Sequence, residues 1–238
     1  MKRTVVVVTA SLAAALAAGV AAQTTGMVTD EETGQSFPSS EDFGGSAHTL
    51  IGVGAFEAYG AFNVYGAGFY LDTEASKRSW QRFLANQGAS FVTDGQVNWD
   101  GLKNSSTLYQ WIYSGSFPKA IWIKVVRDVS RQEVLDMHQD LMRRLVDDYD
   151  TASTQPPLKN YIDAVCNDGV VGDELRIWTK GTTIYVKGSR GSLVTIEDAG
   201  SIIRVVWQLW FGGSPISVPL RRGLVDNLEN LGGPTASP

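Results

Sequence analysis

Short apolar runs, separated by breaks rich in glycine, proline and polar residues, predict a chain of alternating strands and helices. Residues 49–72 predict two strands linked by a turn of small residues. Residues 119–129 are mostly β-branched or aromatic, which predicts a third strand. Residues 173–188 alternate apolar and polar positions on both sides of Gly181, which predicts a β-hairpin. Within the first pair of strands, close backbone approach or bulges are expected at the glycines Gly52, Gly54, Gly66 and Gly68.

Apolar residues at helical spacing predict helices between these strands. The segment 76–87 predicts the first helix, and 158–166 predicts a short one. The segment 130–150 predicts a longer helix that begins at Ser130, because Glu133 follows three residues later and completes a capping box. Two helices are expected towards the C-terminus, an apolar one over 200–213 that ends at Gly212 and an amphipathic one over 214–231.

The order of these elements predicts the fold class. Strands come first, then mixed helices and strands, and the strands are joined as hairpins rather than through crossover helices. This order is typical of an α+β protein with an antiparallel sheet and helices on one face. Residues 23–48 are polar and rich in glycine, serine and acids, which predicts a poorly ordered leader with at most one early strand. Residues 233–238 are expected to form a disordered tail.

The N-terminus has the pattern of a secretory signal peptide over residues 1–22. Lys2 and Arg3 precede an apolar run from Val5 to Ala22, and small residues occupy the cleavage site before Gln23. A retained membrane anchor is the alternative, because the run is about as long as the shortest membrane span. Cleavage predicts an exported product, periplasmic or secreted, with no stable membrane span.

Composition narrows the possible partners. The 238 residues are 43% hydrophobic and carry a formal net charge of −5, which argues against nucleic acid or anionic lipid as the main partner. Cys166 is the single cysteine, so an exported chain has no internal disulfide, and its position on an apolar helix face favours burial over a nucleophilic role. Asn104 begins a glycosylation sequon, which matters only in a eukaryotic source.

Familiar catalytic and metal-binding patterns are absent from the sequence. His48 and His138 are far apart and, with one cysteine, give no metal-ligand spacing. The glycines near residue 54 do not follow dinucleotide-binding spacing, and no serine lies in a nucleophile-elbow motif. No cofactor and no catalytic residue is therefore predicted. If sheet and helices enclose a slot, its walls would be hydrocarbon, and a lone tyrosine hydroxyl would orient the bound molecule. A dry core is the alternative.

Five segments, in order, resemble the chalcone isomerase superfamily, and within it the exported chalcone-isomerase-like proteins of bacteria. They are GVGAF, VYGAGFYLD, VVRDVS, GDELRIWTKGTTIYVKG and WQLWFGGSPISVPLRRGLV. The resemblance covers Thr49 to Leu228 and implies a chalcone-isomerase-like domain over 49–232. It implies an open-faced β-sandwich in which a layer of helices covers one face of a large antiparallel sheet.

The catalytic pattern of that superfamily is missing here. The position of the arginine that holds the reacting phenolate is Phe56, and the position of the strand threonine is Tyr65. No tyrosine or asparagine occurs from Ser130 to Leu145, and the late-helix hydroxyl position aligns with Leu209. Losing a positioned cation beside a reacting oxyanion removes about 3 kcal/mol of transition-state stabilisation, by analogy with the loss of an oxyanion-hole donor. Chalcone isomerisation is therefore not expected.

The resemblance implies instead a non-catalytic protein that binds a fatty acid or another small apolar ligand between sheet and helices. The ligand-binding residues it implies are Tyr65, Phe56, Leu209 and Arg127. Lys124 is an alternative partner for a ligand head group, and Arg127 has the alternative role of linking strand to helix. Tyr70 should face away from Tyr65 unless a bulge at Gly66 or Gly68 intervenes, because an odd offset reverses the side of a strand. Two other functions stay open: an intramolecular lyase acting on a phenolic substrate, and an interaction protein with no ligand.

Overall fold

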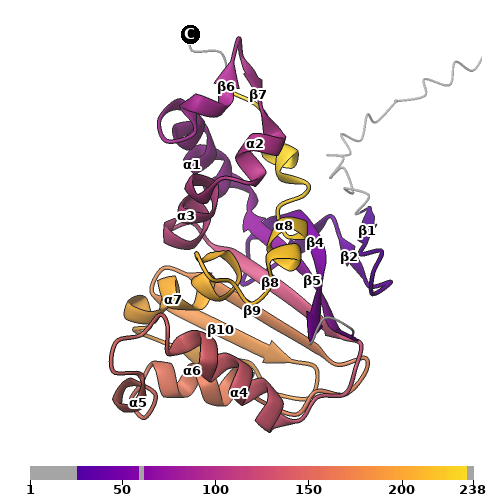
Figure 1. The fold of residues 1–238 in the computed structure, drawn as a ribbon, viewed down its shortest axis with the longest axis vertical. Coiled ribbons are helices and arrows are strands. Elements are labelled where there is room, and N and C mark those ends of the chain that lie inside the picture. Colours follow the sequence, from indigo (N-terminus) through magenta and orange to yellow (C-terminus); the bar gives the residue numbers. More distant parts are fainter. Residues whose placement is uncertain (1–25, 59–61, 235–238) are drawn as a thin grey trace, which may run out of the picture.

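The structure, a computed structural model, describes residues 26–58 and 62–234. A seven-stranded antiparallel sheet forms its centre, with the strand order β11-β10-β9-β8-β5-β4-β3 (Figure 1). The strands are β3 (Ser40–Asp42), β4 (Ala47–Ala58), β5 (Phe62–Asp72), β8 (Lys119–Val125), β9 (Glu174–Lys180), β10 (Thr183–Gly188) and β11 (Val194–Ile196). Both predicted hairpins are therefore present, β4 with β5 and β9 with β10.

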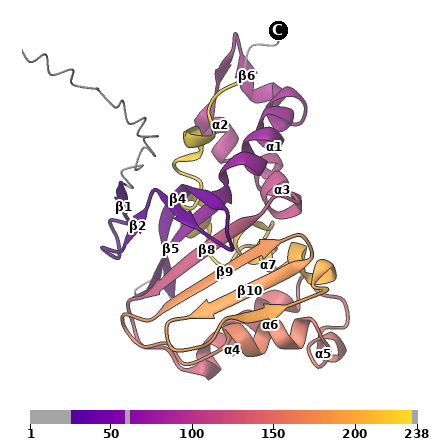
Figure 2. The same ribbon diagram turned by 180° about the vertical axis from the view of Figure 1, so that it is seen from behind.

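Helices cover one face of this sheet. Figure 1 shows them in front of β9 and β10, whereas the view from behind in Figure 2 shows the same strands without a covering helix. They are α4 (Arg131–Met142), α5 (Tyr149–Ala152), α6 (Leu158–Val165) and α7 (Gly200–Phe211). The Ser130 hydroxyl and the Glu133 carboxylate form the predicted capping box at the start of α4. The helix layer on one face confirms the predicted α+β arrangement.

A second group of elements extends the molecule beyond the end of the sheet (Figure 1). It consists of α1 (Thr73–Ala85), β6 (Val92–Thr93), β7 (Gln96–Val97), α2 (Trp99–Lys103) and α3 (Ser106–Ser114). Asp72 begins α1, because its carboxylate accepts the backbone N–H groups of Glu74 and Ala75. Trp80 and Trp111 pack with their ring centroids 5.2 Å apart and hold α1 against α3. This group carries no part of the cavity described below.

The prediction of a poorly ordered leader over 23–48 is wrong for the part that the structure describes. This part forms β1 (Met27–Thr29) and β2 (Ser36–Pro38), which lie on the sheet face opposite the helices, and β3, the edge strand of the sheet itself. The ring of Phe37 packs edge-on against Trp122, with centroids 6.2 Å apart, and Phe43 lies 5.2 Å from Tyr70. Two buried aromatic side chains thus fix a segment whose polar composition predicted disorder.

Three predicted elements are shorter than the sequence indicated. The strand predicted to residue 129 ends at Val125, and the helix predicted to residue 150 ends at Met142. Asp148 has a left-handed backbone with φ of 48°, which a continuing helix does not allow. The helix predicted over 214–231 splits into α8 (Val218–Gly223) and a 3₁₀ turn, η2 (Leu228–Leu231). Between them the Asn227 N–H donates to the Ile51 carbonyl of β4, and this bond replaces a helical one.

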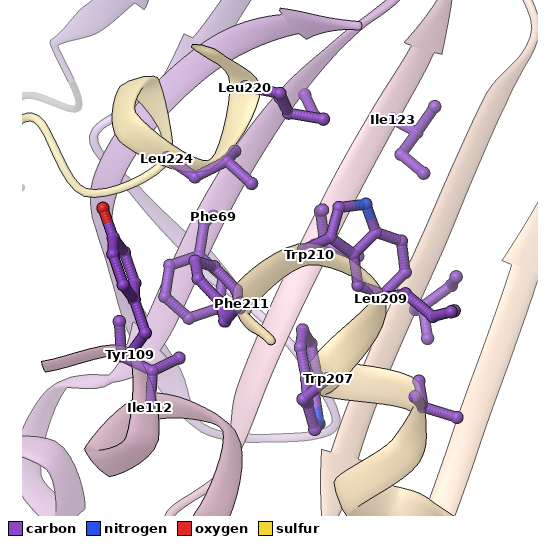
Figure 3. Packing of buried hydrophobic residues seen from close by; sticks show 14 of the residues in the cluster. Phe69, Tyr109, Ile112, Ile123, Trp207, Leu209, Trp210, Phe211, Leu220 and Leu224 are labelled. Atoms are coloured by element: carbon purple, nitrogen blue, oxygen red, sulfur yellow. The ribbon is translucent and has the colours of Figure 1, made fainter. Parts of the chain in front are cut away.

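The glycines of β4 allow α8 to lie directly on the sheet. A Cβ atom at Gly52 would lie 2.1 Å from the Gly223 carbonyl oxygen, a distance that no side chain tolerates. The predicted close approach at this glycine is therefore confirmed. The packed core on the helix side brings Trp207 and Phe211 from α7 over Phe69 of β5 (Figure 3).

The N-terminal segment proposed as a signal peptide, residues 1–22, lies outside the described residues. So does most of the tail proposed over 233–238, although the Gly233 carbonyl accepts a hydrogen bond from Gln81. Within the described ranges, every helix is too short or too polar to cross a membrane.

Candidate functional site

A cavity of about 980 Å³ lies between the helix-covered face of the sheet and the helices α4, α6 and α7. Its size is at the upper end of the range that small-molecule sites usually occupy, which is about 300–1,000 Å³. Strands β4, β5, β8, β9 and β10 all contribute side chains to one wall. Figure 1 shows α4, α6 and α7, which form the opposite wall, in front of β9 and β10. The predicted slot between sheet and helices is therefore present in the structure.

The walls of the cavity are mainly hydrocarbon. Antiparallel pairing places alternate residues of each strand on the same face, so the apolar positions of five strands gather there. The sheet contributes Phe56, Val64, Tyr65, Ile123, Val125, Leu175, Ile177 and Val186. The helices and the segment after α7 contribute Val134, Met137, Leu141, Ala164, Val165, Leu209, Trp210 and Ile216. Figure 3 shows Leu209 and Trp210 projecting from α7 on the side of Ile123.

Tyr65 provides a hydroxyl in this apolar wall. It lies directly opposite Phe56 in the register of β4 and β5, and the two rings stack with centroids 5.1 Å apart. Burial raises the pKa of the Tyr65 phenol well above its ordinary value, and the neighbouring Trp210 indole partly lowers it. The Trp210 Nε1–H makes no hydrogen bond with a described residue. Tyr65 is therefore a neutral phenol at physiological pH, beside an indole N–H that makes no hydrogen bond.

Tyr161 of α6 adds a further polar group near Tyr65. Its pKa is raised, first by burial, then by the thiol of Cys166 and by Tyr65. The Tyr161 hydroxyl is fully buried and has no hydrogen-bond partner. Cys166 is itself fully buried, and burial raises the pKa of its thiol to about 12, which keeps it protonated and unreactive. The thiol is therefore a packing group, as its position in the sequence indicated.

His138 of α4 lines the cavity from the helix side. Its Nδ1 lies 2.9 Å from the Val134 carbonyl oxygen, which can only accept, so Nδ1 carries the proton. Burial lowers the pKa of the imidazole, which keeps it neutral and leaves Nε2 as a hydrogen-bond acceptor. The cavity wall thus offers a donor at Tyr65 and an acceptor at His138, and both groups are uncharged.

Carboxylates dominate the charged part of the cavity lining. Nine acidic residues contribute to the cavity lining, but the carboxylate of Glu174 lies on the other face of the sheet, near Lys124 and the Trp122 indole. Eight carboxylates therefore face two guanidinium groups, those of Arg127 and Arg190. Arg190 forms two hydrogen bonds with Asp173, which together with other bonds holds the pKa of that carboxyl well below its usual range. We call the eight carboxylates the acidic rim: Glu57, Asp128, Glu133, Asp136, Asp140, Asp163, Asp168 and Asp173.

Most of the acidic rim is not neutralised. Two of its members, Asp163 and Asp173, form ion pairs, and the other six form none with a described residue. Of the two arginines in the lining, Arg190 is paired with Asp173, whereas Arg127 forms no ion pair with a described residue. Its guanidinium lies 4.6 Å from the ring centre of Phe62, at the exposed start of β5. The potential around this opening is therefore negative.

The structure places the predicted site residues as follows. Tyr65, Phe56 and Leu209 come together in the cavity wall, and Arg127 lies at its exposed edge. Lys124 lies on the other face of the sheet, where its Nζ donates to the Ser36 carbonyl and lies 4.8 Å from the Trp122 ring centre. It is therefore wrong as a partner for a ligand head group, because its neighbour Val125 occupies the cavity side of β8.

Sequence reasoning missed Trp210, His138 and the acidic rim as parts of the site. The helical spacing of Trp207 and Trp210 indicated a buried face, but not which of the two rings would reach Tyr65. The rim residues come from loops and helix ends that are distant in sequence, so no local pattern could join them. Within residues 26–58 and 62–234, no three histidine, cysteine, aspartate or glutamate side chains are grouped to hold a metal ion.

The structure is similar to the crystal structure of a fatty-acid binding protein of Arabidopsis thaliana, with a TM-score of 0.63. The two share 16% sequence identity, and the similarity covers 87% of this chain and 98% of that one. By sequence, no known protein family and no curated protein matches the chain. At this identity the similarity concerns the fold, and it confirms the prediction: the chain has the chalcone isomerase-type fold.

Proposed function

We propose that this chain is a non-catalytic protein that binds a small apolar ligand, a fatty acid or another lipid-like molecule, between sheet and helices. The observation that carries the proposal is the cavity of about 980 Å³ with its hydrocarbon walls and the Tyr65 hydroxyl. Burial of apolar surface would provide most of the binding free energy, at roughly 25 cal/mol per Å². The fold similarity to a plant fatty-acid binding protein supports the same function.

The proposal of binding without catalysis depends on Phe56. In the chalcone isomerases that the sequence resembles, an arginine at this position holds the reacting phenolate. Here the position is occupied by a buried phenyl ring that stacks on Tyr65. A phenolate in this cavity would have no cation at that point, and an unpaired buried charge is strongly disfavoured.

Native mass spectrometry of the purified chain, followed by extraction into organic solvent, tests this proposal. We expect one apolar molecule to copurify with the protein and to appear in the extract. Met137→Trp should reduce the bound fraction, because the larger side chain fills the cavity from α4. Met27→Trp is the matched control, since Met27 is 58% exposed on β1 and does not line the cavity. Absence of copurified and added lipid from the unaltered chain would refute ligand binding, and turnover of chalcones would refute the absence of catalysis.

We also propose that the chain is exported, periplasmic or secreted, after cleavage of residues 1–22, as in the exported bacterial branch of chalcone-isomerase-like proteins. The support is the sequence pattern of two basic residues, an apolar run and small residues before Gln23. Expression of the full gene, followed by intact mass measurement of the product outside the cytoplasm, tests this. A mature N-terminus at Gln23 is expected, and an uncleaved product retained in the membrane fraction would contradict it.

A further inference from the structure

We infer that the cavity selects an uncharged apolar molecule whose oxygen accepts the proton of Tyr65, such as an ester, an aldehyde or a ketone, and that it rejects ionised carboxylates. The inference rests on the proposed function and deepens it by naming the class of ligand. It follows from the chemistry of the two places at which a ligand's polar end could lie. One is beside Tyr65, and the other is at the acidic rim.

Two polar groups beside Tyr65 make no hydrogen bond with a described residue. They are the Trp210 Nε1–H, whose indole lowers the pKa of Tyr65, and the Tyr161 hydroxyl, whose pKa is raised by Tyr65. Indole is a donor only and the Tyr161 hydroxyl makes no hydrogen bond, so the Tyr65 proton is available to a ligand. A ligand with a carbonyl oxygen can therefore accept this hydrogen bond, and a purely hydrocarbon ligand cannot.

A carboxylate beside Tyr65 would have no cation to balance its charge. Phe56 occupies the place opposite Tyr65, and the cavity lining contains no lysine. Arg127 lies at the exposed edge, where its guanidinium rests on the ring of Phe62. Moving an ionised carboxylate from water into such a site carries a large desolvation penalty, which neutral donors compensate only in part.

The opposite orientation is equally unfavourable for a carboxylate. A head group at the opening would meet the acidic rim, in which six carboxylates have no ion-pair partner and face a single uncommitted guanidinium. The carboxylate of the ligand and those of the rim would repel each other, and physiological salt screens this repulsion only in part. Both orientations thus favour a neutral head group, and the neutral imidazole of His138 is compatible with one.

A pair of ligands that differ only in charge tests the inference. We would titrate the full chain with dodecanoic acid and with methyl dodecanoate, and measure binding by calorimetry at about pH 8, where a carboxylic acid is ionised. The ester should bind at least about tenfold more tightly than the acid. Lowering the pH to about 5 should strengthen binding of the acid, which becomes partly protonated, and leave binding of the ester unchanged.

Variants of the acidic rim identify the source of the discrimination. Asp136→Asn with Asp140→Asn removes two unpaired carboxylates of α4 and should narrow the difference between the ester and the acid at about pH 8. Asp147→Asn with Glu197→Gln is the matched control, because both side chains are exposed and lie outside the cavity lining. This control should leave the difference unchanged.

The outcomes separate the inference from the function on which it rests. If neither ligand binds, the proposed binding function is wrong. If the acid binds as tightly as the ester at about pH 8, or more tightly, the protein binds lipids but the inference is overturned. If the unaltered chain and the variant with Asp136→Asn and Asp140→Asn prefer the ester to the same degree, the acidic rim is not what rejects carboxylates, and that part of the inference is wrong.

Discussion

The ring of Phe56 is stacked on the ring of Tyr65, with centroids 5.1 Å apart and ring planes inclined by 28°. The two residues oppose each other in the register of β4 and β5, so strand pairing fixes the contact. Phenyl and phenol together form an apolar surface from which a single hydroxyl projects. A cation in place of Phe56 would change the chemistry of the whole cavity, because the position adjoins the only tyrosine in its lining.

Removing the Tyr65 hydroxyl should weaken binding without unfolding the protein. Tyr65→Phe keeps the ring stack with Phe56 and deletes one hydrogen bond to the ligand, which contributes about 0.5–1.5 kcal/mol. Affinity for methyl dodecanoate should therefore fall by roughly threefold to tenfold, as measured by calorimetry. The unfolding midpoint should change little, because the ring stack with Phe56 is kept and the neighbouring Trp210 N–H makes no hydrogen bond with a described residue.

Tyr70→Phe is the control for this change. Tyr70 lies on the same strand, but on the other face, packed against Phe43, and its hydroxyl also has no partner. This variant should bind methyl dodecanoate as the unaltered chain does. Equal losses of affinity in both variants would show that the effect comes from the strand and not from the cavity hydroxyl.

Introducing a cation at position 56 should reverse the ligand preference. Phe56→Arg places a guanidinium opposite Tyr65, where it can bind the carboxylate of dodecanoic acid through charge-assisted hydrogen bonds. Such bonds contribute about 1.5–3 kcal/mol, so affinity for the acid at neutral pH should rise by about tenfold or more. Phe56→Leu removes the same ring without adding charge and should not favour the acid. A Phe56→Arg protein that folds and still prefers the ester would contradict this assignment.

The sequence predicted the sheet and the helix layer because their side-chain periodicities are local. Tyr65 and Tyr70 lie on the same strand, β5, and their rings are on opposite faces of the sheet, as their odd spacing predicted. The capping box at Ser130 and the helix end at Gly212 are likewise short-range signals, and the structure has both. Strand alternation and helix capping both depend on the geometry of a single strand or helix, so a short stretch of sequence is enough to predict them.

The parts that the sequence did not predict depend on contacts between distant segments. The segment 26–48 is polar, yet Phe37 and Phe43 are buried against the far face of the sheet, which no pattern within the segment indicates. The acidic rim is similar, since Glu57 and Asp173 become neighbours of one cavity only after folding. Local signals predicted the walls of the site, therefore, but not its electrostatics.

A buried lysine should make stability depend on pH. Lys119 is 1% exposed, its Nζ donates to the Gly115 carbonyl, and burial lowers its pKa from 10.5 to about 7. Between these two values the unfolded chain holds a proton that the folded chain has released, so the free energy of unfolding rises with pH across this window. The slope from this group is at most about 1.4 kcal/mol per pH unit. Urea denaturation at several pH values would measure it.

Lys119→Met should remove this rise, because methionine has a similar length and no proton to release. Lys77→Met, at an exposed position on α1, is the control and should keep the rise. The difference between the two variants should appear above about pH 7 and grow towards higher pH. Identical pH profiles in both would contradict the proposed role of the buried amine.

The contact between β4 and α8 should tolerate no side chain at Gly52. In Gly52→Ala, the new Cβ would lie 2.1 Å from the Gly223 carbonyl oxygen, and neither atom belongs to a flexible side chain that could move away. Relief requires α8 to shift from the sheet, and overpacking of this kind destabilises proteins by about 1–3 kcal/mol or more. Gly213→Ala is the matched control, because a Cβ atom there would have no neighbour within 4 Å. The unfolding midpoint in urea should fall for Gly52→Ala and stay unchanged for Gly213→Ala. A Gly52→Ala protein as stable as the unaltered chain would show that α8 is not packed on β4 in solution as it is here.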